Sequence, residues 1–199
     1  MARDEKILPT RDRVFAWRLG PGLRESAVDA SAFNAALDRI VDDIATARSQ
    51  PAQLLALLTR AAPLLRIAGR LDEARKTAAA AIAIAELVED SDAVFANQLA
   101  LAQVLQRERR FEISTPLFDQ LIVQARSSPA LADRLHDVLF GAGVNLFEQQ
   151  RHTQAAKCFR ESQQLRRESG REDLLEISAE ALRQTRDAEN GVRDNFPKG

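Results

Sequence analysis

The chain has 199 residues and a formal net charge of −1 at pH 7, with 28 Lys and Arg against 29 Asp and Glu. This balance disfavours a nucleic-acid binder that relies on bulk positive charge. The length suits one domain with a sizeable core or a short array of repeats. A single cysteine, Cys158, excludes an internal disulfide and fits a reducing compartment.

The beginning of the sequence, MARDEKILPTRDR, is charged where a secretory signal needs an apolar core. No apolar run approaches the roughly 18 residues of a membrane span. We therefore expect a cytoplasmic protein without a membrane partner. Abundant alanine and arginine, together with the absence of tyrosine, favour a bacterial source.

Helix-forming residues dominate the sequence, and sustained strand alternation is absent, which predicts an all-α chain. After an N-terminal arm at 1–30, Ser31 is the expected cap of a helix over 31–50, whose apolar residues recur at helical spacing. Further helices are expected over 52–68, 71–89, 93–108, 112–126, 130–149, 153–168 and 172–189. Residues 190–199 are expected to be a flexible tail.

A short turn sequence recurs along these helices. Arg70–Ala74 is followed 40 residues later by Arg110–Ser114 and 41 residues after that by Arg151–Ala155. Positions before the turn align as Leu58, Ala61, Ala62 and Leu65 with Gln98, Leu101, Ala102 and Leu105, and with Leu139, Ala142, Gly143 and Leu146. Positions after the turn align as Ala74 and Ala78 with Ser114 and Phe118, and with Ala155 and Phe159. The sequence therefore contains three repeats.

This spacing is that of the tetratricopeptide signature, W-x2-L-G-x2-Y followed by A-x3-F. The chain thus resembles the tetratricopeptide repeat (TPR) family, and its period of about 40 residues is similar to that of kinesin-light-chain-type and bacterial TPR proteins. The resemblance implies a right-handed α-solenoid of stacked antiparallel helix pairs. The implied parts are repeats at about 52–90, 92–128 and 130–170 within a repeat domain at 51–189, an N-capping helix at 31–50 and a C-terminal cap at 171–189.

Three residues depart from the family pattern. Gln98 stands where a bulky apolar residue is usual, and Arg109 stands before the second turn where glycine is usual. Pro116 leaves open a late start of the fifth helix, with Thr115 as its cap.

In this family, the first helix of each repeat (helix A) lines a concave groove. Carried over by position, the candidate partner-binding residues are Thr59, Arg60, Pro63, Arg66, Leu99, Gln103, Gln106, Arg107, Asp137, Phe140, Val144 and Glu148. Arginines beside exposed apolar side chains (Leu99, Phe140, Val144) suit an extended or helical peptide with apolar and acidic side chains. The alternative is an ordinary solvated face.

The segment at 11–23 holds Phe15, Trp17 and Leu19 among charged residues, glycine and proline. One interpretation is a docking arm that lies in the groove of its own chain or of a second copy. In that case it competes with the partner. The alternative is an arm that packs on the first helix and covers the end of the array.

No catalytic, metal-binding or cofactor-binding motif appears. His136, His152 and Cys158 are the only soft ligands, and we expect one packed histidine, one solvent-facing histidine and a small apolar cysteine. The prediction is a non-enzymatic protein- or peptide-binding scaffold or adaptor without a cofactor. The alternatives are a self-associating homodimer and, with less support, a helical-repeat nucleic-acid binder.

Overall fold

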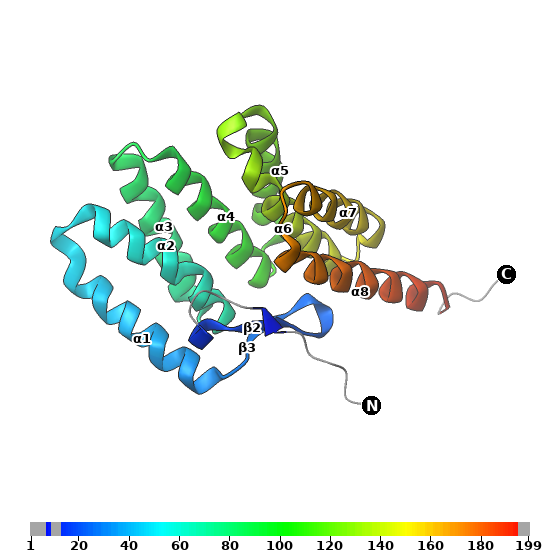
Figure 1. Ribbon diagram of the computed structural model, residues 1–199, viewed down its shortest axis with the longest axis horizontal. Helices are drawn as coiled ribbons and strands as arrows, with labels where there is room; N and C mark the ends of the chain where they lie inside the picture. The colour runs from blue at the N-terminus through cyan, green and yellow to red at the C-terminus, as the bar shows by residue number, and fades with distance from the viewer. Residues whose placement is uncertain (1–6, 9–12, 195–199) are drawn as a thin grey trace. The chain divides into compact units, whose positions relative to one another are not determined.

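The computed structural model describes residues 7–8 and 13–194 (Figure 1). Residues 190–194 of the predicted flexible tail (190–199) belong to a helix, so that part of the prediction is wrong, while residues 195–199 and the arm residues 1–6 and 9–12 lie outside this description. The described residues form eight α-helices: α1 Ala30–Thr46, α2 Pro51–Ile67, α3 Leu71–Leu87, α4 Ser91–Arg107, α5 Phe111–Ser127, α6 Leu135–Glu148, α7 His152–Glu168 and α8 Leu175–Asp194. The prediction of an all-α chain is confirmed.

Several helix ends differ from the sequence-based expectation. The cap of α1 is Asp29 rather than Ser31, because its Oδ1 accepts a hydrogen bond of 3.0 Å from the Ala32 amide. Helix α5 begins at Phe111 and contains Pro116, so the late start at Thr115 is wrong. Helix α8 continues to Asp194, beyond its predicted end at residue 189.

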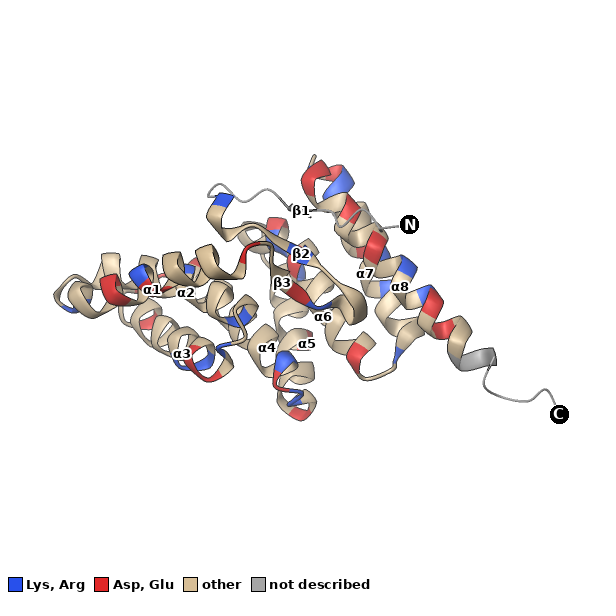
Figure 2. Cartoon of the chain, turned by 90° about the horizontal axis from the view of Figure 1, so that it is seen from below, with Lys and Arg blue, Asp and Glu red and all other residues tan. Residues whose placement is uncertain are grey.

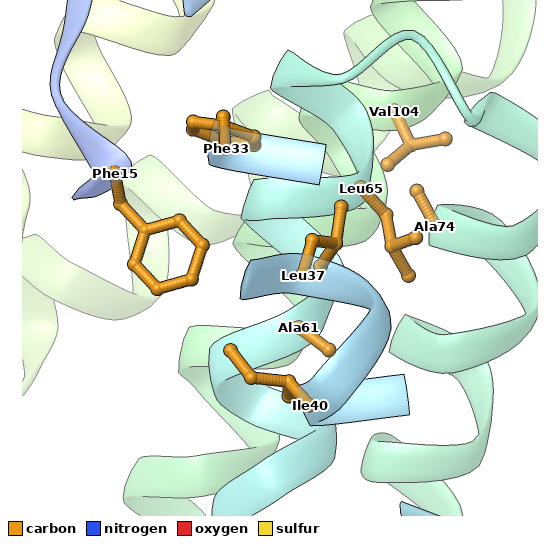
Figure 3. Close-up of a cluster of buried hydrophobic side chains, with 8 residues drawn as sticks. All are labelled: Phe15, Phe33, Leu37, Ile40, Ala61, Leu65, Ala74 and Val104. Atoms are coloured by element: carbon orange, nitrogen blue, oxygen red, sulfur yellow. The ribbon is translucent and has the colours of Figure 1, made fainter. Parts of the chain in front are cut away.

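The chain divides into two compact units, one made of residues 1–18 and 25–117 and the other of residues 19–24 and 118–199. In unit 1, α1 packs on α2, α2 packs on α3 and α4, and α3 packs on α4. One core cluster of this unit consists of Phe15, Phe33, Leu37, Ile40, Ala61, Leu65, Ala74 and Val104 (Figure 3). Phe15 comes from the arm, and its ring meets that of Phe33 edge to face at 5.2 Å.

In unit 2, α7 packs against both α6 and α8. Phe159 of α7 is completely buried beside Val144, Ala155 and Ala181. A methyl group on Gly143 would come within 2.5 Å of the Phe159 ring. Gly143 is therefore explained by the close approach of α6 and α7.

The recurring turn sequence has a common geometry. The residue after the C-cap is left-handed at the ends of α2, α3, α4, α6 and α7, with φ between 57° and 79°: Gly69, Glu89, Arg109, Gln150 and Gly170. The next amide donates to a carbonyl five residues earlier, as from Arg70 to Leu65 at 2.9 Å and from Arg151 to Leu146 at 3.0 Å. These are Schellman turns, which end one helix and direct the chain into the next.

The arm contains three short strands that the sequence did not predict. Strands β1 (Ile7–Leu8), β2 (Trp17–Leu19) and β3 (Glu25–Ala27) form a sheet in the order β1-β2-β3. The pairing of β1 with β2 is antiparallel. A 3-10 turn at Pro21–Leu23, with Gly22 at φ 67°, separates β2 from β3. Strands of two or three residues are too short to show a period in the sequence.

Candidate binding face

In unit 1, two arginines of α2 meet the arm. Arg66 is 6% exposed and forms an ion pair with Glu25 of β3. The Arg60 guanidinium lies 5.5 Å from the centre of the Phe15 ring, a cation–π contact. Arg66 is therefore not the solvent-facing arginine that the groove prediction requires, because an arm carboxylate already neutralises it.

The other candidates of unit 1 lie on α2 and α4. Asn97 is fully buried and donates a hydrogen bond of 2.9 Å to the Thr59 hydroxyl, which ties α4 to α2. Gln106 is also buried. The remaining candidates of this unit are half-buried: Pro63, Leu99, Gln103 and Arg107. For these residues a role in binding stays a prediction.

In unit 2, the arm residues Leu19 and Leu23 lie in one apolar cluster with Phe140 and Val144 of α6. Leu23 is 2% exposed and Val144 is 9% exposed. Phe140 is half-buried, and its ring centre lies 5.4 Å from that of Phe159. The expectation that Leu99, Phe140 and Val144 are exposed is therefore wrong, and in unit 2 the covering residues include the arm's own leucines.

Polar groups of α6 and α8 hold the same arm segment. The Gln184 side chain accepts a hydrogen bond of 3.2 Å from the Leu23 amide and donates one of 3.1 Å to the Gly20 carbonyl. Arg24 lies 3.3 Å from a carboxylate oxygen of Glu148. The sequence predicts a C-terminal cap at 171–189 and gives no binding role to Gln184. The signal available in the sequence was an amide side chain, Gln184, on the inward side of the last helix.

Asp137 belongs to a largely buried polar network. Its carboxylate lies 2.9 Å from His136 Nδ1 and 3.3 Å from the guanidinium of Arg166, which also donates to the Ser178 hydroxyl at 2.8 Å. Arg166 is 3% exposed and stacks 4.7 Å from the Phe140 ring centre. Burial acts to raise the pKa of Asp137, but the hydrogen bond and electrostatic interaction with His136 and the positive charge of Arg166 outweigh it and lower this pKa. The Asp137 carboxylate is thus largely occupied by contacts within unit 2.

Neither histidine faces solvent, which contradicts one part of the sequence-based expectation. His136 is 4% exposed, and the half-buried His152 meets the Phe147 ring at 5.3 Å. Burial raises the pKa of the half-buried Cys158 thiol, with help from Glu161 and Asp119. In the part of the chain that the structure describes, no three His, Cys, Asp or Glu side chains gather as a metal site would require.

The fold of the chain is similar to that of a solved structure. BtubC (BKLC) from P. vanneervenii superimposes with a TM-score of 0.50 over 85% of this chain and 75% of that chain, at 17% identity. The chain has a TPR-like helical-repeat fold. The TPR-like prediction is thereby confirmed at the level of fold.

A second solved structure is described as "Podosopora anserina putative kinesin light chain nearly identical TPR-like repeats". It matches with a TM-score of 0.49 and 15% identity over 81% of this chain and 89% of that chain. No protein-family model matches the TPR-like chain. No curated protein matches it either. None of the helices within residues 13–194 has the length and apolar character that crossing a membrane requires.

Proposed function

We propose that this TPR-like chain is a non-enzymatic scaffold or adaptor that binds another protein or peptide through its A helices, α2, α4 and α6. One observation supports this most strongly. In both units, residues predicted for the binding face already hold polypeptide from outside the repeats, namely the arm. The contacts are Glu25 on Arg66 in unit 1 and Leu23 on Val144 in unit 2.

The physical basis of binding is a rigid face. The A helices are fixed by small buried residues such as Ala62 and Ala102, both fully shielded from solvent. A face that is ordered before binding loses little conformational entropy when a partner arrives. Extended segments gain affinity from apolar anchors and from hydrogen bonds to their backbone.

On α2, the partner chemistry is apolar and acidic. The buried Arg66 donates a hydrogen bond to the Glu25 carboxylate, and the Arg60 guanidinium lies over the Phe15 ring. An acidic and aromatic segment of another protein would make the same contacts. Acidic and basic residues are interspersed along α7 and α8 (Figure 2), which gives little support to a basic stripe for nucleic acid.

The proposal is tested by quantitative affinity capture from a cytoplasmic extract of the source cell. Arg60→Glu reverses an exposed charge on α2, and Arg160→Glu makes the same reversal on an exposed position of α7. We expect one protein to be captured by wild type and by Arg160→Glu, but at least about tenfold less by Arg60→Glu. Equal capture by all three chains would contradict binding through α2.

Self-association is the competing function, and light scattering after size-exclusion chromatography separates the two. A monomer that captures a different protein supports the scaffold. A stable dimer with no other captured protein supports self-association instead.

A further inference from the structure

The α6–α8 face, which we define as Phe140, Val144 and Glu148 of α6 with Leu182 and Gln184 of α8, holds one six-residue segment. That segment, Leu19–Arg24, belongs to unit 2, while the chain on either side of it belongs to unit 1. Its two leucines are four residues apart and lie in the apolar cluster of this face. The face thus packs a short segment through two regularly spaced apolar anchors.

A single side chain forms hydrogen bonds to the backbone of the segment. Gln184 both accepts from the Leu23 amide and donates to the Gly20 carbonyl. The Gly20 amide also donates to the Arg24 carbonyl at 2.7 Å, which closes the turn between the two leucines. Backbone groups are present in any polypeptide, so these bonds favour a chain conformation and leave the choice of sequence to other contacts.

At the end of the segment, a charged contact provides the preference for a particular sequence. The Glu148 side chain is 7% exposed, and neither of its oxygens has a hydrogen-bond partner. Its ion-pair partner is Arg24, which is 47% exposed and lies 3.3 Å away without hydrogen-bond geometry. A buried carboxylate in this state strongly favours a cation, and a guanidinium that approaches with both nitrogens would satisfy it better than Arg24 does.

We propose that the α6–α8 face recognises a turn-forming segment of a partner protein with two leucines four residues apart and an arginine directly after the second. This inference rests on the proposed scaffold function and names the partner chemistry of its third repeat. The segment is apolar and basic, in contrast to the acidic chemistry that Arg66 favours on α2. The chain's own Leu19–Arg24 has this sequence and shows how such a segment fits.

The test uses a fluorescent peptide of residues 16–28, AWRLGPGLRESAV, and the full chain. Arg24→Glu places a like charge beside Glu148 and weakens the binding of the resident segment, and because Arg24 is 47% exposed we expect the chain to remain folded. Arg160→Glu on exposed α7 is the control with the same change of charge. Fluorescence anisotropy should show the peptide binding about tenfold tighter to Arg24→Glu than to wild type or the control.

A second peptide, in which glutamate replaces the arginine that corresponds to Arg24, measures the charge preference of the face. On the Arg24→Glu chain this peptide should bind at least about tenfold more weakly than the first. When Glu148→Arg is added to that chain, the peptide with glutamate should bind more tightly than the peptide with arginine. Circular dichroism checks that each variant is folded, and Leu23→Ser with Arg24→Glu provides a more open face if the single change releases too little.

Two outcomes would overturn the inference. The first is no peptide binding to either folded variant. The second is equal binding of both peptides, which would leave the leucines without an arginine requirement. If either occurs while Arg60→Glu still abolishes capture from the extract, the scaffold function stands and only this partner chemistry fails.

Discussion

Glu25 of β3 and Arg66 of α2 form an ion pair that is largely shielded from water, with side chains 16% and 8% exposed. The two residues are 41 positions apart, so the pair fixes the arm on the second helix. Removing one partner of a buried pair leaves an uncompensated charge.

We expect Arg66→Met to lower the free energy of unfolding by about 3 kcal/mol, because Glu25 would remain buried without its counter-ion. The double change of Glu25→Leu with Arg66→Met should recover most of that loss. Lys76→Met, which removes an exposed pair with Asp72, should cost less than about 1 kcal/mol. Urea denaturation of the four chains measures these values, and a loss at Arg66 no larger than at Lys76 would contradict the buried pair.

Gly143→Ala should destabilise the chain by about 1–3 kcal/mol, because the new methyl group would overlap the Phe159 ring. Gly191→Ala is a matched control in α8, where nothing lies within 4 Å of the added methyl. Replacing that helical glycine should raise stability by up to about 1 kcal/mol. Thermal unfolding followed by circular dichroism tests both, and equal effects would rule out close packing at Gly143.

Gln150→Gly should stabilise the turn between α6 and α7. Gln150 has a φ of 63°, a left-handed conformation that costs a side-chain-bearing residue about 1 kcal/mol and glycine almost nothing. Gln150 is exposed, so little packing is lost in exchange. The expected gain in the free energy of unfolding is about 0.5–1 kcal/mol by urea denaturation. A net loss would show that the glutamine side chain contributes more than its backbone conformation costs.

The ionisation of Asp137 should make the free energy of unfolding depend on pH in the acidic range. Its pKa lies below the ordinary value of 3.8 in the folded chain, so the folded state binds fewer protons there than the unfolded state. The contribution is fully present above the unfolded pKa and is lost as the pH falls through the folded pKa. The free energy of unfolding of wild type should therefore drop more steeply below about pH 4 than that of Asp137→Asn. Parallel slopes for the two chains would exclude this role of the carboxylate.

The repeats were predictable because their signals are local. Helical spacing, the small residues at Ala62, Ala102 and Gly143, and the recurring turn all lie within about 20 residues of the contacts they determine. Gly143 is an example, because the residue that requires a glycine there is Phe159, which follows at the expected spacing in the next helix.

The arm was not predictable in the same way. Its hydrogen bond from Leu23 to Gln184 joins residues 161 positions apart, and its strands are too short to show a period. Arg66 and Val144 were correctly placed on A helices, but their burial depends on this remote segment. A sequence pattern identifies the face of a helix, whereas the segment that covers it is set by tertiary contacts.

In the proposed function, a partner binds the A helices of the repeats. The most direct test places a photo-crosslinking amino acid at Gln103, half-buried on α4, and in a second chain at Val123, which is 64% exposed on the second helix of its repeat. After irradiation in cell extract, the account predicts a covalent adduct with one other protein from position 103 and none from position 123. An adduct from position 123 alone would place the interface on the second helices of the repeats and contradict binding through the A helices.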